Sequence, residues 1–339
     1  MSLFKAETRR LAKRRFSRYF VLGAVLVLVA VAIGMFVSNE KPTPAVIAQA
    51  QAEADRYFQE QTGYAAEEKK RCESLTPEQM KQQYGEGFTC DQLGQLQRED
   101  VQIQDFMPSQ FDFRENFPGM VTTLAAILAM VAFVVGASFI GAEWNSGGMM
   151  NLLLWRPRRL QVLSTKLAAL VVSLIGLTVT LSAVWTGLFW VIATMRGTTA
   201  KMTSGAWQSI GLLELRGMVL VLAAGMIGFG LASIGRHTAM ALGAAIGVIV
   251  VFQFGLAVVL QVARVRFAEA YLLPFWGIAW LEKEWEVLDY NAPCDFSAVN
   301  GCEPPSMVIT WQMAGIAMLA VVGLVTMAAM WTMRKRDIT

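Results

Sequence analysis

Long apolar stretches alternate with polar ones along this chain, and the apolar stretches recur at the length of a membrane-spanning helix. A helix needs about 20 mostly apolar residues to cross the roughly 30 Å hydrocarbon core of a bilayer. Six stretches meet this requirement, at residues 20–37, 121–142, 167–195, 218–234, 238–262 and 308–331. The pattern predicts an all-α membrane protein with six transmembrane helices.

The segments between these spans complete the expected organisation. Residues 1–19 place apolar side chains on one side of a helix and basic ones on the other, which predicts an amphipathic elbow helix in the headgroup layer. A retention signal made of positive charge alone would explain the same residues. The predicted order is elbow helix 1–19, first span 20–37, a large helical extracytoplasmic loop 38–117, spans two to five in 118–262, an extracytoplasmic, partly re-entrant segment 263–306, and the sixth span with a cytoplasmic tail 307–339.

Composition and charge agree with a multi-pass protein of the cell membrane. Hydrophobic residues make up 55% of the chain and charged residues only 16%, against roughly 25% charged residues in soluble proteins. Basic residues cluster before the first span and again at Arg334, Lys335 and Arg336, so both termini are expected in the cytoplasm. No basic stripe with interleaved aromatic residues indicates a nucleic acid partner.

The cysteines fall in two pairs on the segments assigned to the outside. Cys72 and Cys90 lie in the first outer loop, and Cys294 and Cys302 lie in the last. Two local disulfides are expected in that oxidising compartment, each worth about 3 kcal/mol. Free thiols or metal ligands are the alternative, but a zinc site is not expected because the single histidine lies on the other side.

Motifs of catalysis are missing from the sequence. It contains no GxxxxGK[ST] phosphate loop, no HExxH helix and no GxSxG elbow. We therefore expect no catalytic residues, no metal and no cofactor in this chain, and any energy source must be a partner.

The segment between the second and third spans carries the most specific pattern. It runs from Gly141-Ala-Glu143 through Gly147-Gly148 and an apolar run to Pro157, Arg159 and Lys166. This order, at this topological position, resembles the type-2 family of ABC transporter permeases. The resemblance covers the elbow helix, the six spans and the re-entrant segment, whereas the outer loop at 38–117 is longer than the family's usual first loop.

The resemblance implies a partnership with a soluble ABC ATPase, which would bind the ATP and Mg. It also implies a second permease copy, a homodimer being expected over a heterodimer, within membrane lipid. The inner loop 143–166 would be a coupling helix that inserts Met149, Leu152 and Leu153 into a groove on the ATPase. Its polar residues would fix the loop's angle through contacts to the ATPase, to lipid headgroups or to each other. The residues implicated in ATPase coupling are Glu143, Gly147, Gly148, Met149, Leu152, Leu153, Pro157, Arg158, Arg159 and Lys166.

The expected function is an ATP-driven exporter for an amphipathic or lipophilic compound. Candidate substrate contacts near the middle of the second and fifth spans are Met130, Phe133, Phe252, Gln253 and Leu256. Two alternatives remain open: the inner loop is an interfacial helix with snorkelling arginines, or the protein is a non-transporting scaffold or sensor whose outer loop binds a ligand. A membrane-embedded lipid enzyme is the third hypothesis, and the missing acid and base residues count against it.

Overall fold

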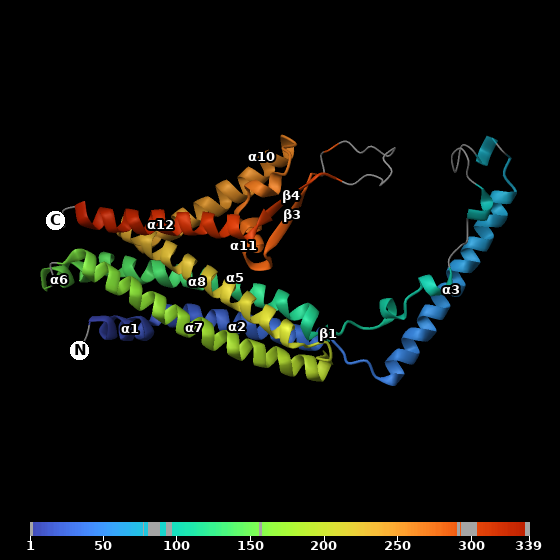
Figure 1. Ribbon diagram of the computed structural model, residues 1–339, viewed down its shortest axis with the longest axis horizontal. Helices are drawn as coiled ribbons and strands as arrows, with labels where there is room; N and C mark the ends of the chain where they lie inside the picture. The colour runs from blue at the N-terminus through green and yellow to red at the C-terminus, as the bar shows by residue number, and fades with distance from the viewer. Residues whose placement is uncertain are drawn as a thin grey trace. The chain divides into compact units, whose positions relative to one another are not determined.

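The computed structural model describes residues 3–76, 78–80, 89–92, 97–155, 158–289, 292 and 304–335. The chain folds as two compact units, shown with its helices in Figure 1. The first unit comprises Met1–Ala32, Arg114–Trp190 and Lys201–Thr339, and the second comprises Ile33–Phe113 and Val191–Ala200.

Six helices in the described part of the chain are long and apolar enough to cross a membrane. Five are uninterrupted α-helices that extend beyond the predicted apolar cores at one end or both. The six spans are α2 (Arg15–Ser38), α5 (Phe113–Asn145), α7 (Arg159–Arg196), α8 (Ser204–Gly235), the continuous run Thr238–Val262, and α12 (Trp311–Lys335). The prediction of six spans is confirmed.

Glycines bring α8 close to its neighbours in the first unit. A side chain at Gly136 on α5 would collide with the backbone of Gly225 on α8, and one at Gly228 would collide with the backbone of Phe133. On the other side of α8, Gly230 meets Val325 of α12. Small residues let helix backbones approach closely in lipid, where no hydrophobic force drives helices together. Helix α8 is therefore packed between α5 and α12.

The fifth span differs from the others in geometry and in exposure. It consists of α9 (Thr238–Gly247), a π-helical segment η4 (Val248–Gly255) and α10 (Leu256–Val262). Most of its apolar side chains point away from the rest of the unit, with Phe252 and Phe254 among the most exposed. Lipid or another protein surface must cover this span, because the unit itself leaves it open.

A small mixed structure precedes α12 in the chain. It contains η5 (Ala268–Tyr271), α11 (Leu273–Glu282) and two antiparallel strands, β3 (Glu284–Leu288) and β4 (Ser306–Thr310). Ala279, Val287, Ile309 and Ala314 form its buried core, against which Trp276, Trp280 and Trp285 pack. The prediction of an all-α chain misses this strand pair, because each five-residue run is stabilised only by a partner that lies far along the sequence.

The second unit is organised around one long polar helix. Helix α3 (Pro44–Glu73) starts at Thr43, whose Oγ1 accepts a hydrogen bond from the Val46 amide at 3.4 Å. The short helices η1 (Cys90–Gln92), η2 (Arg98–Asp100) and η3 (Ile103–Phe106) follow, and β1 (Phe111–Asp112) pairs with β2 (Gly197–Thr198). A disulfide joins Cys72 to Cys90 with a Cα–Cα distance of 5.8 Å, as predicted. The second predicted pair, Cys294 and Cys302, lies outside the described residues.

Candidate functional site

The predicted inner loop is helical for most of its length. Helix α5 ends at Asn145, and Gly147 then takes a positive φ of 69°, which a residue without a side chain adopts most easily. A short helix, α6 (Gly148–Trp155), follows directly, and α7 begins at Arg159. The short turn at Gly147 therefore connects the end of α5 directly to the start of α6.

Three charged side chains from distant parts of the chain meet behind α6. Lys166 on α7 is 0% exposed, and its Nζ lies 2.7 Å from Glu7 Oε2 and 2.6 Å from Glu143 Oε2. Glu7 belongs to α1 (Leu3–Lys13), and Glu143 lies in the last turn of α5. A buried lysine is tolerated only when its charge is paired, so these contacts join α1, α5 and α7.

Arg14 completes a group of two acids and two bases, which we call the charge cluster: Glu7, Arg14, Glu143 and Lys166. Its Nη1 donates to the carbonyl oxygens of Ser138 and Phe139 at 2.7 and 3.1 Å, and its Nη2 lies 3.7 Å from Glu143. Burial lowers the pKa of Arg14, while the carboxylates of Glu143 and Glu7 act in the opposite direction. The formal charges of these four residues cancel, which favours their burial, and the exposed Arg10 adds a further base 3.5 Å from Glu7 Oε1.

Both bases of the charge cluster contact the same aromatic ring. Lys166 Nζ lies 5.2 Å from the ring centroid of Phe139, and the guanidinium carbon of Arg14 lies 5.5 Å from it. Each contact adds a cation–π attraction to the ion pairs. The cluster is therefore held by hydrogen bonds, charge and an aromatic ring together.

Helix α6 buries one face and exposes the other. Met149 and Leu153, one turn apart, are packed inside the unit, and Leu152 is half-buried. Met150 and Leu154 point outward, and Leu154 and Trp155 are 81% and 88% exposed. Two of the three predicted docking side chains, Met149 and Leu153, are therefore buried in the chain's own core. The outward apolar face of α6 consists of Met150, Leu154 and Trp155.

A polar recess opens beside α6. It has a volume of about 540 Å³ and is lined by Arg10, Arg14, Glu143, Gly148, Asn151, Leu152 and Trp155. The exposed ring of Trp155 lines it together with the basic side chains of Arg10 and Arg14. The recess therefore offers both an apolar and a cationic surface.

The turn between α8 and α9 packs against the same end of α5. The guanidinium carbon of Arg236 lies 4.9 Å from the centroid of Trp144, and Thr238 fills the space that a side chain at Gly141 would need. His237 Nδ1 accepts from the Ala239 amide at 3.1 Å and so starts α9. His237 is a helix cap in this structure.

Comparison with known families agrees with this architecture over the whole chain. The family model described as "ABC-2 family transporter protein" matches residues 1–338. The chain belongs to the ABC-2 transporter family. No curated protein and no solved structure gives a significant match. An ABC-2 permease is a multi-pass protein of the cell membrane and a transport subunit that is not itself catalytic, and the family in general works with an ATPase subunit.

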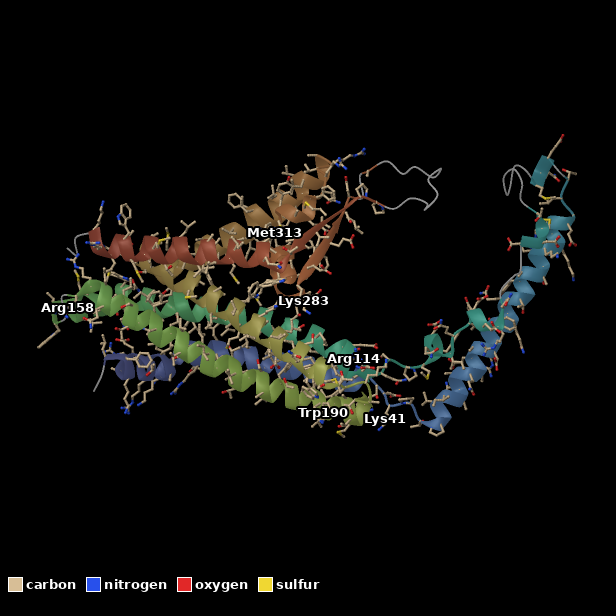
Figure 2. The ribbon with its side chains drawn as sticks, in the orientation of Figure 1. Lys41, Arg114, Arg158, Trp190, Lys283 and Met313 are labelled. Atoms are coloured by element: carbon tan, nitrogen blue, oxygen red, sulfur yellow. A yellow bond between two sulfur atoms is a disulfide. The ribbon has the colours of Figure 1, made fainter. Side chains whose placement is uncertain are left out.

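The remaining predicted coupling residues of the permease lie around α6. Arg158 is exposed at the α6 end of the first unit, where Figure 2 labels it, and Arg159 is partly buried at the start of α7. Pro157 lies outside the described residues. Contacts to the ATPase, to lipid headgroups or to each other were considered for the polar residues of the loop. In the structure, Glu143 and Lys166 contact each other.

The five predicted substrate-path residues of the permease have different surroundings. Met130 and Phe252 are mostly exposed, and Phe133 and Leu256 are half-buried. Gln253 Oε1 accepts from the Leu273 amide at 2.8 Å, which ties the fifth span to the start of α11. Gln253 therefore joins two elements of the first unit, and a substrate role for all five residues stays a prediction.

Sequence reasoning missed two residues of the charge cluster, Glu7 and Arg14. One available signal was that Glu7 is the only acid among the basic residues before the first span. An isolated acid of this kind, on a segment with apolar residues at helical spacing, indicates a specific basic partner. The partner itself, Lys166, is too distant in sequence for any local pattern to identify it.

Proposed function

We propose that this permease is the membrane subunit of an ATP-driven exporter, whose ATPase docks on the outward face of α6. The observation that carries the proposal is an exposed apolar face, Met150, Leu154 and Trp155, on a short helix whose other face is anchored in the bundle. In Figure 1, α1, α6 and the end of α12 lie at one end of the first unit. The basic residues at this end support a cytoplasmic location for it and for both termini.

The outward face of α6 is large enough to serve as a docking anchor. Burying a side chain such as Leu154 or Trp155 against a partner would contribute about 1.5–3 kcal/mol each. Tryptophan is also enriched among the residues that dominate binding energies at interfaces. The neighbouring recess, with Arg10 and Arg14, would receive acidic or carbonyl groups of the same partner.

The charge cluster would transmit movement from α6 to the spans. Lys166 joins α7 to both α1 and α5, and α6 lies between α5 and α7 in the chain. A force that an ATPase applies to α6 would then move these three helices as one body. Repacking of rigid helices of this kind is a common route for conformational change.

Two apolar features support a lipophilic cargo and a second copy of the permease. A cavity of about 560 Å³ between α8, α11 and α12 is lined almost wholly by apolar side chains, including Met226, Trp280 and Trp311. The exposed fifth span offers a surface on which a second copy could pack. We propose a homodimer that exports an amphipathic or lipophilic compound.

The test is gentle purification of the permease from its native membrane, with mass spectrometry of the subunits that accompany it. The proposal predicts a soluble subunit with a phosphate loop, in a two-to-two ratio. Leu154→Asp should abolish this association, because it places a charge in the docking face. Leu154 is chosen over the neighbouring Leu153 because an aspartate at the buried Leu153 would disturb the permease itself.

The matched control is Leu160→Asp, which adds the same charge to a less exposed apolar position at the start of α7. This variant should retain the ATPase. Absence of any ATPase from the wild-type preparation, or equal retention by Leu154→Asp, would overturn the proposal and direct attention to a ligand-binding role of the second unit.

A further inference from the structure

A carboxylate on α8 faces a row of hydroxyl groups on α7. Thr186 Oγ1 donates to Glu214 Oε1 at 2.6 Å, and Thr178 and Ser182 precede Thr186 at intervals of four residues, which places all three on one side of α7. Thr178, Ser182, Gly211 and Glu214 line a recess of about 290 Å³ between the two helices. We call this the α7–α8 recess.

The α7–α8 recess lies toward the end of the first unit opposite α6. Trp190 on α7 and Trp207 on α8 pack with ring centroids 5.4 Å apart, and Figure 2 shows Trp190 far along α7 from Arg158. Tryptophan is enriched at the membrane–water interface. Glu214 follows Trp207 by seven residues, or about 10 Å of helix, so it lies on the membrane side of this aromatic pair. An acid at that depth is costly without a partner, which makes it a candidate functional group.

No basic side chain in the described part of the chain forms an ion pair with Glu214, and its hydrogen-bond donor, Thr186, is neutral. The nearest base along α8, Arg216, is engaged elsewhere. Its Nη1 donates to the Leu281 carbonyl at 3.4 Å, and its guanidinium carbon lies 5.4 Å from the centroid of Trp311. No base within the described residues therefore compensates the negative charge in the recess.

Another polar group of the recess, the hydroxyl of Thr178, has no hydrogen-bond partner in the described part of the chain. Thr178 is 4% exposed, and its Oγ1 makes no hydrogen bond. Other hydroxyls on the same helix behave differently, since Ser173 and Thr180 donate to the carbonyls of Ala169 and Gly176 at 2.7 and 2.8 Å. A buried hydroxyl without a partner carries a free-energy cost that a bound ligand would remove.

The walls of the recess indicate what kind of ligand fits. Val179, Ala183 and Leu215 surround its polar floor with apolar surface, and Val179 and Leu215 are exposed. A volume of about 290 Å³ is far larger than one small ion, since a water molecule occupies only about 30 Å³. The recess thus combines an anionic, hydroxyl-lined floor with an apolar rim.

We propose that the α7–α8 recess binds the ammonium group of a lipophilic amine, which Glu214 and the α7 hydroxyls hold while the apolar part lies along the rim. The inference rests on the proposed export function in one respect, because it makes such an amine the transported substrate.

Gly211 keeps the recess open. A Cβ at this position would meet no atom within 4 Å, so a larger side chain can be introduced there without a collision.

The test measures saturable binding of radiolabelled dodecylamine to the purified permease, without any ATPase, in lipid nanodiscs. Excess unlabelled dodecylamine should displace the label, and dodecanol and dodecanoate should not. Glu214→Gln should weaken binding by about tenfold or more, because it removes the charge from a charge-assisted hydrogen bond. Gly211→Leu should weaken it as well by filling the recess, whereas Gly187→Leu, an equally open position on α7 that does not line the recess, should not.

Binding that is absent from the wild type, that dodecanol displaces equally well, or that both Glu214→Gln and Gly211→Leu leave unchanged would overturn the proposal. Full displacement of the amine by sodium ions would overturn it too, in favour of a metal cation site. Because the assay needs no ATPase, it separates this inference from the export proposal. Absence of amine binding with intact ATPase association would overturn only the proposal that the recess binds an amine. Amine binding without any ATPase partner would overturn only the export proposal.

Discussion

Lys166 and Glu214 are both ionisable residues on membrane-spanning helices, yet their surroundings differ in one decisive respect. Lys166 is completely buried between two carboxylates, and Arg14 brings the formal charge of its group to zero. Glu214 has a threonine as its partner and lies beside an open recess. The charge of Lys166 is neutralised by side chains of the same protein. The charge of Glu214 is left for a ligand to neutralise.

This difference indicates different roles. A buried group whose charges cancel stabilises one arrangement of helices, because removal of one charge leaves an uncompensated charge inside the protein. A carboxylate whose described partner is a neutral hydroxyl, at the edge of an apolar recess, adds little to the fold and is available to a cationic ligand. Four substitutions test this distinction, from the largest expected effect to the smallest.

Lys166→Met should cause the largest loss of stability. It leaves Glu7 and Glu143 buried without their shared cation, and breaking a buried ion pair in this way costs about 3–5 kcal/mol. Unfolding in detergent micelles, followed by tryptophan fluorescence, would measure the loss. Lys201→Met is the control, since Lys201 pairs with Glu115 at the surface and such pairs contribute about 0–1 kcal/mol. Equal losses in both variants would contradict a stabilising role for the charge cluster.

Arg14→Gln should have an intermediate effect of about 2 kcal/mol on the free energy of unfolding. The substitution removes two donations to backbone carbonyls and the contact with Phe139, but Lys166 still pairs both carboxylates. Arg18→Gln is a matched control in the same segment, because Arg18 is exposed and donates to the Ala12 carbonyl. The same unfolding measurement should rank Arg14→Gln between Lys166→Met and this control.

Glu214→Gln should change the free energy of unfolding by only about 0.5 kcal/mol or less. The amide oxygen can still accept from Thr186, and no ion pair is lost. Glu143→Gln is the informative comparison, because it removes a charge from the closed cluster and should be clearly more destabilising. A similar loss in the two variants would show that Glu214 is also a structural residue and would remove the contrast between the two sites.

The smallest effect is expected at an exposed pair in the second unit, where Lys69 Nζ lies 2.6 Å from Asp91. The hydrogen bond from Lys69, together with its charge, lowers the pKa of Asp91 below the ordinary value of 3.8. A carboxyl with a lowered folded-state pKa stabilises the fold above its ordinary value, and that contribution is lost as the pH falls from about 3.8 through the lowered folded-state pKa.

Lys69→Ala should therefore increase hydrogen exchange at the end of α3 slightly near neutral pH and have no effect in strong acid. The opposite pH dependence, with an effect only in acid, would contradict the ion pair. The adjacent Cys72–Cys90 disulfide holds the same end of α3, so the change should be local.

The spans and the family were predictable because their signals are local. Each span is recognised from about 20 consecutive residues that must satisfy the bilayer, and nothing outside the window changes that requirement. The ordered residues from Gly141 to Lys166 likewise lie in one continuous segment. The Cys72–Cys90 pair was predictable because both residues lie in one loop.

The charge cluster, the outward face of α6 and the α7–α8 recess depended on tertiary structure. Glu7 and Lys166 are separated by 159 positions, so only the packing of α1 against α7 makes them partners. Residues 152–155 of α6 are all apolar, so the periodicity does not distinguish Leu153, which is buried, from Leu154, which is exposed. The sequence by itself determined which segments enter the membrane, because lipid acts on each helix separately. Only the tertiary structure decided which charges are paired and which are left open, because pairing depends on helices that are distant along the chain.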